Sequence, residues 1–234
     1  MIKAILFDLD GTLLPMNQED FTNSYFHLLS KTMEKYGYSP EYMVKAVWTG
    51  TGAMVKNDGS TTNEEVFWRE FSKFFDRDVR ADEPLFNAFY ENEFQNVKKY
   101  CGYNENAKKL VDEARSMGYR VILATNPLFP AIATESRIRW AGLVPEDFEL
   151  YTTYEDIGYC KPNLKYYQEI LKRIDLLPKE CMMIGNDVSE DMVAEQLGMK
   201  VFLLTDCLIN KENTDISFYP NGSFKEALEY IKCQ

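Results

Sequence analysis

Histidine is almost absent from this 234-residue sequence, in which His27 is the only one. The five cysteines are scattered without a CxxC pair, at Cys101, Cys160, Cys181, Cys207 and Cys233. Zinc sites and His-based catalytic groups need such residues in clusters, so the sequence argues against both. An odd number of dispersed cysteines is typical of reduced thiols, which predicts a cytoplasmic protein without a disulfide framework.

Positive charge is also scarce, because 26 Lys and Arg residues stand against 37 Asp and Glu residues. The formal net charge is −11, whereas nucleic acids and anionic membranes bind basic surfaces. We therefore expect neither as a partner, although a local basic pocket for a small anion is compatible with this charge. No stretch approaches the ~20 apolar residues that cross a bilayer. The N-terminus also lacks the pattern of a cleavable signal peptide.

Short, continuous apolar runs recur along the chain, as expected for strands buried on both faces of a parallel sheet. These runs cover residues 2–8, 119–125, 181–185 and 200–205, with a weaker one at 148–154. Helical patterns lie between them at 107–118, 163–174 and 189–198, the last with Ser189 as a plausible N-cap. This alternation predicts an α/β fold with a doubly wound parallel sheet.

Residues 16–98 differ from the rest because they contain no buried-strand run. Helical patterns follow one another at 18–36, 40–48, 63–76 and 82–96. A segment of this length is too long for a loop. We therefore expect an all-helical second domain over residues 16–98, inserted into an α/β core made of residues 1–15 and 99–234.

Polar side chains cluster where the expected strands end. They are Asp8, Asp10, Thr125, Asn126, Lys161, Asp187 and Asp191. Ligands of open parallel sheets bind at the carboxyl ends of the strands, so these side chains are expected to meet in one crevice.

The residue types in this crevice indicate phosphoryl chemistry. Several carboxylates close together cannot all stay ionised without a cation, and oxygen ligands without His or Cys favour Mg²⁺. Lys161 and Thr125 could neutralise and hydrogen-bond a phosphoryl group. One carboxylate can act as a nucleophile, while a second carboxyl group donates and accepts the proton.

The segments DLDGTL (8–13) and GNDVSED (185–191), with Thr125 and Lys161 between them, resemble the four ordered motifs of the haloacid dehalogenase (HAD) superfamily of phosphohydrolases. The resemblance spans the whole chain, and the helical segment matches in position the superfamily's cap inserted after the first motif. It implies a Rossmann-like core with a helical cap. It also implies that Asp10 favours phosphate-ester chemistry over dehalogenation, because halide needs no proton on leaving.

The resemblance also implies individual roles. Asp8 would be the nucleophile and a Mg²⁺ ligand. Asp10 would be the general acid and base, with its backbone carbonyl as a second metal ligand. Thr125 would hold the phosphoryl oxygens, with Asn126 beside it at the substrate. Lys161 would steady the charge on Asp8 and on the phosphate.

The fourth motif departs from the common pattern. The family often has Gly-Asp at its start, whereas this chain has Gly185-Asn186-Asp187. Asp187 is the favoured metal ligand, and Asn186 and Asp191 remain alternatives.

We therefore predict a Mg²⁺-dependent phosphatase that acts on a small phosphorylated metabolite through an aspartyl-phosphate. A phosphomutase of the same superfamily and a non-catalytic protein that binds a phosphorylated ligand are the alternatives. The Gly-rich stretch 49–63 is either a flexible loop or a segment that contacts the substrate. Lys56 within it could bind an anionic group or, in a phosphonate hydrolase, form a Schiff base. The sequence indicates no oligomeric state.

Overall fold

The computed structural model describes residues 1–234 and contains a six-stranded sheet in which every pairing is parallel. The strand order is β3-β2-β1-β4-β5-β6. The strands are β1 (Ala4–Phe7), β2 (Arg120–Leu123), β3 (Leu150–Tyr151), β4 (Cys181–Gly185), β5 (Lys200–Leu204) and β6 (Asn221–Gly222). The predicted α/β fold is confirmed, and β1 lies near the centre of the sheet, between β2 and β4.

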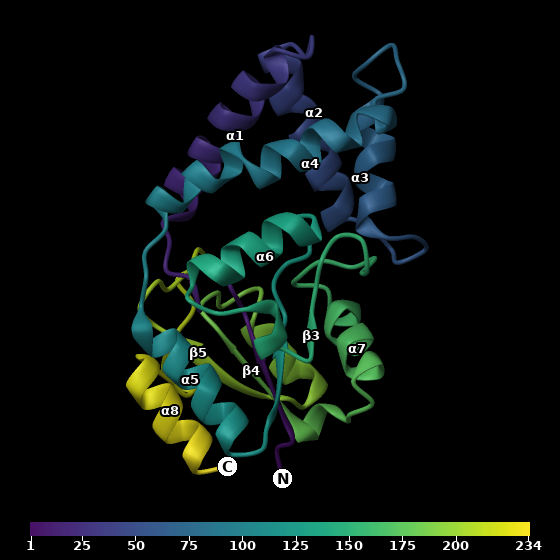
Figure 1. Ribbon diagram of the computed structural model, residues 1–234. Helices are drawn as coiled ribbons and strands as arrows, with labels where there is room; N and C mark the ends of the chain where they lie inside the picture. Colours follow the sequence, from purple (N-terminus) through teal and green to yellow (C-terminus); the bar gives the residue numbers. More distant parts are fainter.

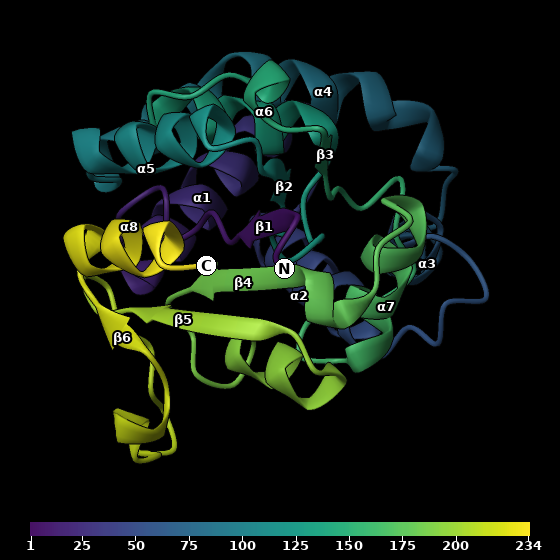
Figure 2. The same ribbon diagram turned by 90° about the horizontal axis from the view of Figure 1, so that it is seen from below.

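Both faces of the sheet are covered, which explains why the strands read as continuous apolar runs. Ile5 and Phe7 of β1 join one hydrophobic core, whereas Ala4 and Leu6 join another. Helices α5 (Glu105–Ser116) and α8 (Phe224–Lys232) pack against the first face. Helix α7 (Leu164–Arg173) packs against the second face, as the view from below shows (Figure 2).

A helical layer lies between β1 and β2 in chain order. It consists of α1 (Gln18–Glu34), α2 (Pro40–Val55), α3 (Asn63–Ser72), α4 (Glu83–Glu91) and the 3₁₀ segment η2 (Glu93–Tyr100). Figure 1 shows this layer beyond the carboxyl ends of the strands, with α6 (Ala131–Trp140) between the layer and the sheet. The layer is therefore placed to cover whatever binds at the strand ends.

Aromatic side chains hold the helical layer together. The ring of Phe71 packs edge-on against Trp68 and Phe86 and stacks with Phe67. All three contacts are in the range of favourable aromatic pairs, with ring centroids 5.4 to 5.6 Å apart. The density of aromatic residues in this segment therefore reflects its own core as well as the pocket described below.

Helix α2 is longer than its sequence pattern indicates. The pattern ends at residue 48, but the helix continues to Val55, so the expected loop over 49–63 is limited to residues 56–62. Gly50 lies against α3, where an added Cβ would stand 2.6 Å from the Phe67 ring. The glycine in this stretch therefore allows two helices to pack closely instead of breaking the first one.

Other elements also differ from expectation, and β6 and α8 were not expected at all. The predicted helix 189–198 is only a 3₁₀ segment, η5 (Met192–Leu197), and Ser189 does not cap it. The reason is that Asp187 accepts hydrogen bonds from the backbone N–H groups of Ser189 and Glu190, at 2.8 and 2.9 Å, and so holds a turn there. The pattern also did not indicate α6, because this helix buries polar and charged side chains such as Arg137.

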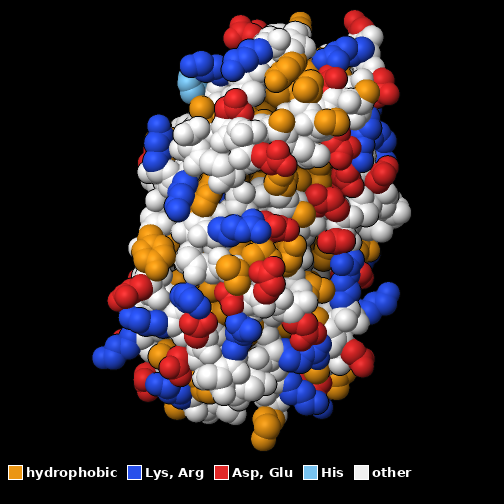
Figure 3. All heavy atoms as spheres, in the orientation of Figure 1, with side chains coloured by type: hydrophobic (Ala, Val, Ile, Leu, Met, Phe, Trp, Pro, Cys, Tyr) orange, Lys and Arg blue, Asp and Glu red, His pale blue; other side chains and the backbone are white.

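No helix in the structure combines the length and apolarity required to cross a membrane. Lys and Arg side chains alternate with Asp and Glu over the face shown in Figure 3. This mixed surface agrees with the absence of a basic stretch in the sequence.

Candidate active site

The turn after β1 brings Asp8 and Asp10 to one pocket. The Asp8 N–H donates to the Ile184 carbonyl at 2.9 Å and so extends the pairing of β1 with β4. Gly11 follows with a φ of +88°, and an added Cβ there would lie 2.4 Å from the Asn186 amide nitrogen. Only glycine suits both the backbone angle and the space. Both carboxylates line the same cavity as a result.

Lys161 forms ion pairs with both the first motif (8–13) and the fourth motif (185–191). Its Nζ donates to Asp8 Oδ1 at 2.9 Å and to Asp191 Oδ1 at 2.6 Å, and its side chain is 1% exposed. Burial acts to lower the pKa of Lys161, but the Asp191 and Asp8 charges outweigh it and raise this pKa well above the ordinary value. Lys161 is therefore the buried cation that keeps these carboxylates together.

Three side chains of the fourth motif (185–191) make different contacts. The Asp191 Oδ2 accepts the Asp187 N–H at 3.0 Å, and an added Cβ at Gly185 would collide with the Asp191 carboxylate. The Asn186 amide donates to the Cys207 carbonyl at 2.7 Å. Asp187 lines the pocket, and its Oδ2 makes no hydrogen bond, so it is the side chain most open to a metal ion.

Thr12 is also part of this network, a role that its residue type and position did not predict. Its hydroxyl lies 2.9 Å from Asp8 Oδ2 and 2.9 Å from Asn186 Oδ1. It can donate to one of these oxygens at a time, so it restrains the Asp8 carboxylate against the fourth motif. The only sequence signal for Thr12 was its place in the first motif.

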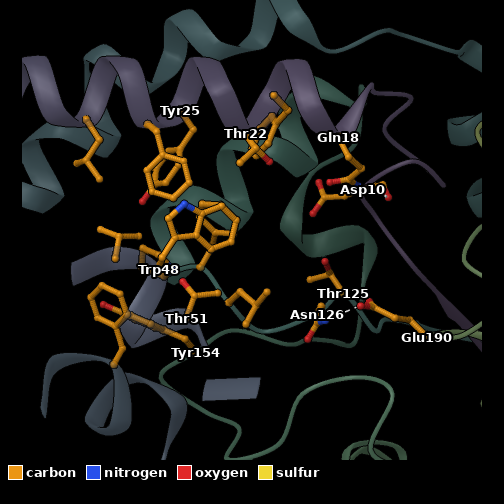
Figure 4. A pocket seen from close by; sticks show the side chains of 18 of the residues that line it. Asp10, Gln18, Thr22, Tyr25, Trp48, Thr51, Thr125, Asn126, Tyr154 and Glu190 are labelled. Atoms are coloured by element: carbon orange, nitrogen blue, oxygen red, sulfur yellow. Dashed lines mark hydrogen bonds between the residues drawn. The ribbon is translucent and has the colours of Figure 1, made fainter. Parts of the chain in front are cut away.

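Thr125 and Asn126 follow β2 and face Asp10 across the pocket (Figure 4). The Thr125 carbonyl accepts hydrogen bonds from the hydroxyls of Thr152 and Tyr166, at 2.6 and 2.8 Å, which fixes its backbone. The Asn126 amide donates to Glu190 at 3.1 Å, and its oxygen accepts the Lys161 N–H at 3.3 Å. The Thr125 hydroxyl is left facing the cavity.

Arg137 on α6 is the main site residue that the sequence did not reveal. Its guanidinium forms an ion pair with Asp10, donates to the Thr134 hydroxyl at 3.2 Å and lies over the Phe129 ring. The side chain is 1% exposed. Burial raises the pKa of Asp10, although the Arg137 charge opposes this shift. No motif marks Arg137, because its place in the site depends on how α6 packs.

Helix α6 also contacts η2. The Gln95 amide donates to the Ser136 hydroxyl at 2.9 Å, and its oxygen accepts the Trp140 indole N–H at 3.2 Å. These two hydrogen bonds connect α6, the helix that carries Arg137, to the helical layer.

Replacing Arg137 by methionine is expected to lower the free energy of unfolding by about 2 kcal/mol, because Asp10 loses its buried counterion. The effect is smaller than for a fully buried pair, since the Asp10 side chain is 21% exposed. Urea unfolding measures the change. Arg139→Met is the matched control, because Arg139 lies on the same helix with its side chain 54% exposed. An equal effect of the two substitutions would contradict the role of the Arg137–Asp10 pair.

The structure does not bring Lys56 to the pocket. Lys56 is the C-cap residue that follows α2, its side chain is exposed, and it is not among the residues that line the cavity. Helix α2 continues through most of the expected loop, so Lys56 lies just beyond the C-terminal end of this helix and outside the pocket. We therefore correct the expectation that Lys56 contacts the substrate and leave it out of the proposed site.

The oxygen atoms at the strand ends fit a Mg²⁺ ion whose other ligands come from water and from a bound phosphate. No group of three or more His, Cys, Asp or Glu side chains is arranged to hold a metal ion. However, the second oxygen of Asp187 is free, Asp8 lines the same pocket, and the Asp10 backbone carbonyl accepts only a 3.3 Å hydrogen bond from the Gln18 amide. Mg²⁺ typically takes only one or two carboxylates, with water and substrate oxygens as its other ligands. The donor set therefore suits Mg²⁺ in the presence of a phosphate.

Comparison with known proteins agrees with this chemistry. A family model described as haloacid dehalogenase-like hydrolase matches residues 2–198. The glyceraldehyde 3-phosphate phosphatase of Methanocaldococcus jannaschii is 28% identical over 240 residues, which cover 99% of this chain and 98% of that protein.

Two solved structures share the fold. A HAD phosphatase from Thermococcus onnurineus has a TM-score of 0.60 at 20% identity, and the match covers 98% of each chain. The HAD-hydrolase YfnB from Bacillus subtilis, solved bound to magnesium, has a TM-score of 0.58 at 18% identity and covers 99% of each chain.

Proposed function

The chain belongs to the haloacid dehalogenase-like hydrolase family, and we propose that it is a Mg²⁺-dependent phosphatase of small phosphorylated metabolites. One observation carries the proposal. Lys161 bridges Asp8 and Asp191 from behind the pocket wall, and both carboxylates line one pocket with Asp10. The similarity to a phosphatase of glyceraldehyde 3-phosphate supports a phosphate monoester as the substrate.

In the proposed first step, an Asp8 carboxylate oxygen attacks the phosphorus atom. The bond between phosphorus and the ester oxygen breaks, and its electron pair stays on the leaving oxygen. Asp10 gives this oxygen a proton, so the alcohol leaves neutral and an aspartyl-phosphate remains on Asp8. Burial raises the pKa of Asp10 and so favours the protonated form that this step requires, while the Arg137 charge opposes it and favours the ionised form that remains.

In the proposed second step, water attacks the same phosphorus atom. Asp10, now ionised, accepts a proton from the water, and the bond between phosphorus and Asp8 breaks. Phosphate leaves and both carboxyl groups return to their starting states. Lys161 and the Thr125 hydroxyl would hold the phosphoryl oxygens through both steps.

A bound Mg²⁺ would neutralise the charge that Asp8 and the phosphoryl oxygens share. Asp8, Asp187 and the Asp10 backbone carbonyl are the residues that would hold it. The Asn186 Oδ1 lies against the Thr12 hydroxyl, and the Asp191 oxygens accept from Lys161 and from the Asp187 N–H, whereas the Asp187 Oδ2 is free, which favours Asp187 over either alternative.

We also propose that residues 16–98 act as a cap and that residues 1–15 and 99–234 form the core. The helical layer lies over the strand ends, and side chains from both parts line the pocket. A closed cap would exclude water during phosphoryl transfer and would limit substrates to small molecules.

Removal of the metal is expected to reduce phosphate release at least about 100-fold, with full recovery when Mg²⁺ is added back. The measurement is inorganic phosphate released from a panel of small phosphomonoesters, with excess EDTA or with Mg²⁺. Unchanged activity in EDTA would contradict the proposed metal. An isomerised sugar phosphate without free phosphate would identify a phosphomutase instead.

The Asp187→Asn variant is expected to need about tenfold or more Mg²⁺ for half-maximal activity. Asp206→Asn is the matched control, because Asp206 follows the neighbouring strand β5 but is exposed and does not line this pocket. A shift of similar size in both variants would rule out Asp187 as the ligand.

A further inference from the structure

The pocket has two chemically different ends. It encloses a cavity of about 290 Å³ whose core end carries the carboxylates at the strand termini. Its other end is built by the helical layer, with Tyr25 of α1 and Trp48 of α2 facing the cavity together with Tyr154 (Figure 4). We call this the aromatic end of the pocket. Half of the 28 lining residues are hydrophobic. The phosphoryl group belongs at the core end, so the other end must receive the rest of the substrate.

The end built by the helical layer carries no charge. None of the lining residues from α1 to α4 is Asp, Glu, Lys or Arg. Lys211 is the only Lys or Arg in the lining, and it belongs to the core end, since the Ile209 backbone nearby pairs with Asn186 and Val188. Two cations stand over lining rings, Arg80 over Trp68 and Arg137 over Phe129, but they are already paired with Glu64 and Asp10. A second phosphate or a carboxylate at the aromatic end would therefore lose its hydration without gaining a free counterion.

The polar groups at this end are neutral. Thr22 and Thr51 line the cavity, and the hydroxyls of Tyr25 and Tyr90 bond each other at 3.0 Å. Burial raises the pKa of both tyrosines, so neither is ionised near neutral pH. The Trp68 indole N–H is buried and has no well-formed hydrogen bond in the protein, although the Tyr154 hydroxyl is close to it. These groups suit a ligand with a neutral acceptor and no ionised group.

Trp48 offers a surface for a flat ring. Trp48 is 54% exposed although it lines the pocket, and one of its faces stacks on Phe26 at a centroid distance of 5.0 Å. Aromatic rings pair favourably in offset-stacked or edge-to-face arrangements. The uncovered part of Trp48 is therefore open to a ring on the substrate.

We propose, on the basis of the phosphatase function above, that the substrate is the phosphomonoester of a neutral alcohol that carries an aromatic ring. The ring occupies the aromatic end, beside Trp48 and Tyr154, while the phosphate lies at Asp8. Substrates with a second anionic group are disfavoured for lack of a counterion at that end.

Binding of non-hydrolysable phosphonates tests the proposal without requiring turnover. Titration calorimetry on the full chain with Mg²⁺ would compare 2-phenylethylphosphonate, n-butylphosphonate and 3-phosphonopropionate. We expect the ring to lower Kd about tenfold relative to the butyl group, and the carboxylate to give no gain over it. Equal Kd values for the phenylethyl and butyl compounds, or tightest binding of 3-phosphonopropionate, would overturn the proposal.

Two variants of α2 give a matched comparison. Trp48→Ala is expected to reduce the ring preference from about tenfold to about twofold. Tyr42→Ala is expected to retain it, because Tyr42 is equally exposed, at 54%, but does not line the pocket. Loss of the preference in both variants would contradict the role of Trp48.

A third variant adds the missing charge and does not depend on removing an aromatic side chain. Thr51→Lys places a cation at the aromatic end, so it is expected to reverse the order and favour 3-phosphonopropionate over n-butylphosphonate. If the order does not change, this end does not contact the leaving group, and the proposal fails.

Turnover separates this inference from the proposed function. Phosphate release from 2-phenylethyl phosphate and n-butyl phosphate would be measured in parallel, since both esters have primary alcohols as leaving groups. Ring-selective binding without phosphate release would contradict the phosphatase function and support the inference. Phosphate release with equal kcat/KM and equal phosphonate Kd values would support the function and overturn the inference.

Discussion

Asp8→Asn is expected to reduce phosphate release by about 10³-fold or more, because an amide oxygen is a poor nucleophile and cannot form the aspartyl-phosphate. Asn has nearly the same shape as Asp, so the new side chain stays within reach of Lys161 and Thr12. The measurement is single-turnover phosphate release in saturating Mg²⁺, with the phosphomonoester that the wild-type protein hydrolyses fastest.

Asp76→Asn is the control for this experiment, because Asp76 is exposed and makes no hydrogen bond or ion pair in the structure. Thermal unfolding of both variants would show that the loss does not come from unfolding. Activity of Asp8→Asn close to that of the wild type would exclude Asp8 as the nucleophile. Acid-stable retention of phosphate on the wild-type chain, absent from the variant, would support it.

Lys161→Met is expected to lower the free energy of unfolding by about 3–5 kcal/mol near pH 8, because it leaves two buried carboxylates without their cation. Asp8 and Asp191 both lie within 3 Å of Lys161 Nζ, and the Lys161 and Asp191 side chains are each 1% exposed. Urea unfolding of the metal-free protein measures the change. Lys172→Met on α7 is the control, since Lys172 is exposed and forms no ion pair.

The cost of Lys161→Met should depend on pH. Burial raises the pKa of Asp191 from 3.8 to about 7, so the folded metal-free protein binds more protons than the unfolded chain between these values. The contribution of Asp191 to stability therefore falls as the pH rises through this range. Loss of Lys161 raises the pKa of Asp191 further. The difference between variant and wild type should then be largest near pH 8 and smaller near about pH 5. A cost that grows on acidification would contradict this explanation.

The sheet was predictable from sequence because its strands are buried on both faces. The four longer strands, β1, β2, β4 and β5, appear as runs of apolar residues, and polar residues follow where a run ends, as Phe7 is followed by Asp8. The edge strand β6 was not predicted, because its two residues, Asn221 and Gly222, form no apolar run. Lys161 is far from Asp8 in the chain, but the rule that ligands bind at strand ends was enough to place the two together.

The parts that sequence did not show depend on packing between helices. Gly50 reads as a helix breaker, yet α2 continues through it because Phe67 occupies the space where a side chain would be. Arg137 lies in a segment for which the sequence predicted no helix, yet it is on α6 and is buried against Asp10 and Phe129. Neither contact leaves a periodic pattern, because each depends on a partner far away in the sequence.

Helix α6 makes the ionic surroundings of Asp10 depend on the position of the helical layer. Gln95 of η2 bonds both Ser136 and Trp140 of this helix, which also holds Arg137 against Asp10. A displacement of η2 from the sheet that keeps both Gln95 hydrogen bonds carries Arg137 away from Asp10. Such an opening of the pocket and the charge state of Asp10 are then thermodynamically coupled. Since such coupling is reciprocal, protonation of Asp10 changes the free energy of opening by the same amount that opening changes the free energy of protonation.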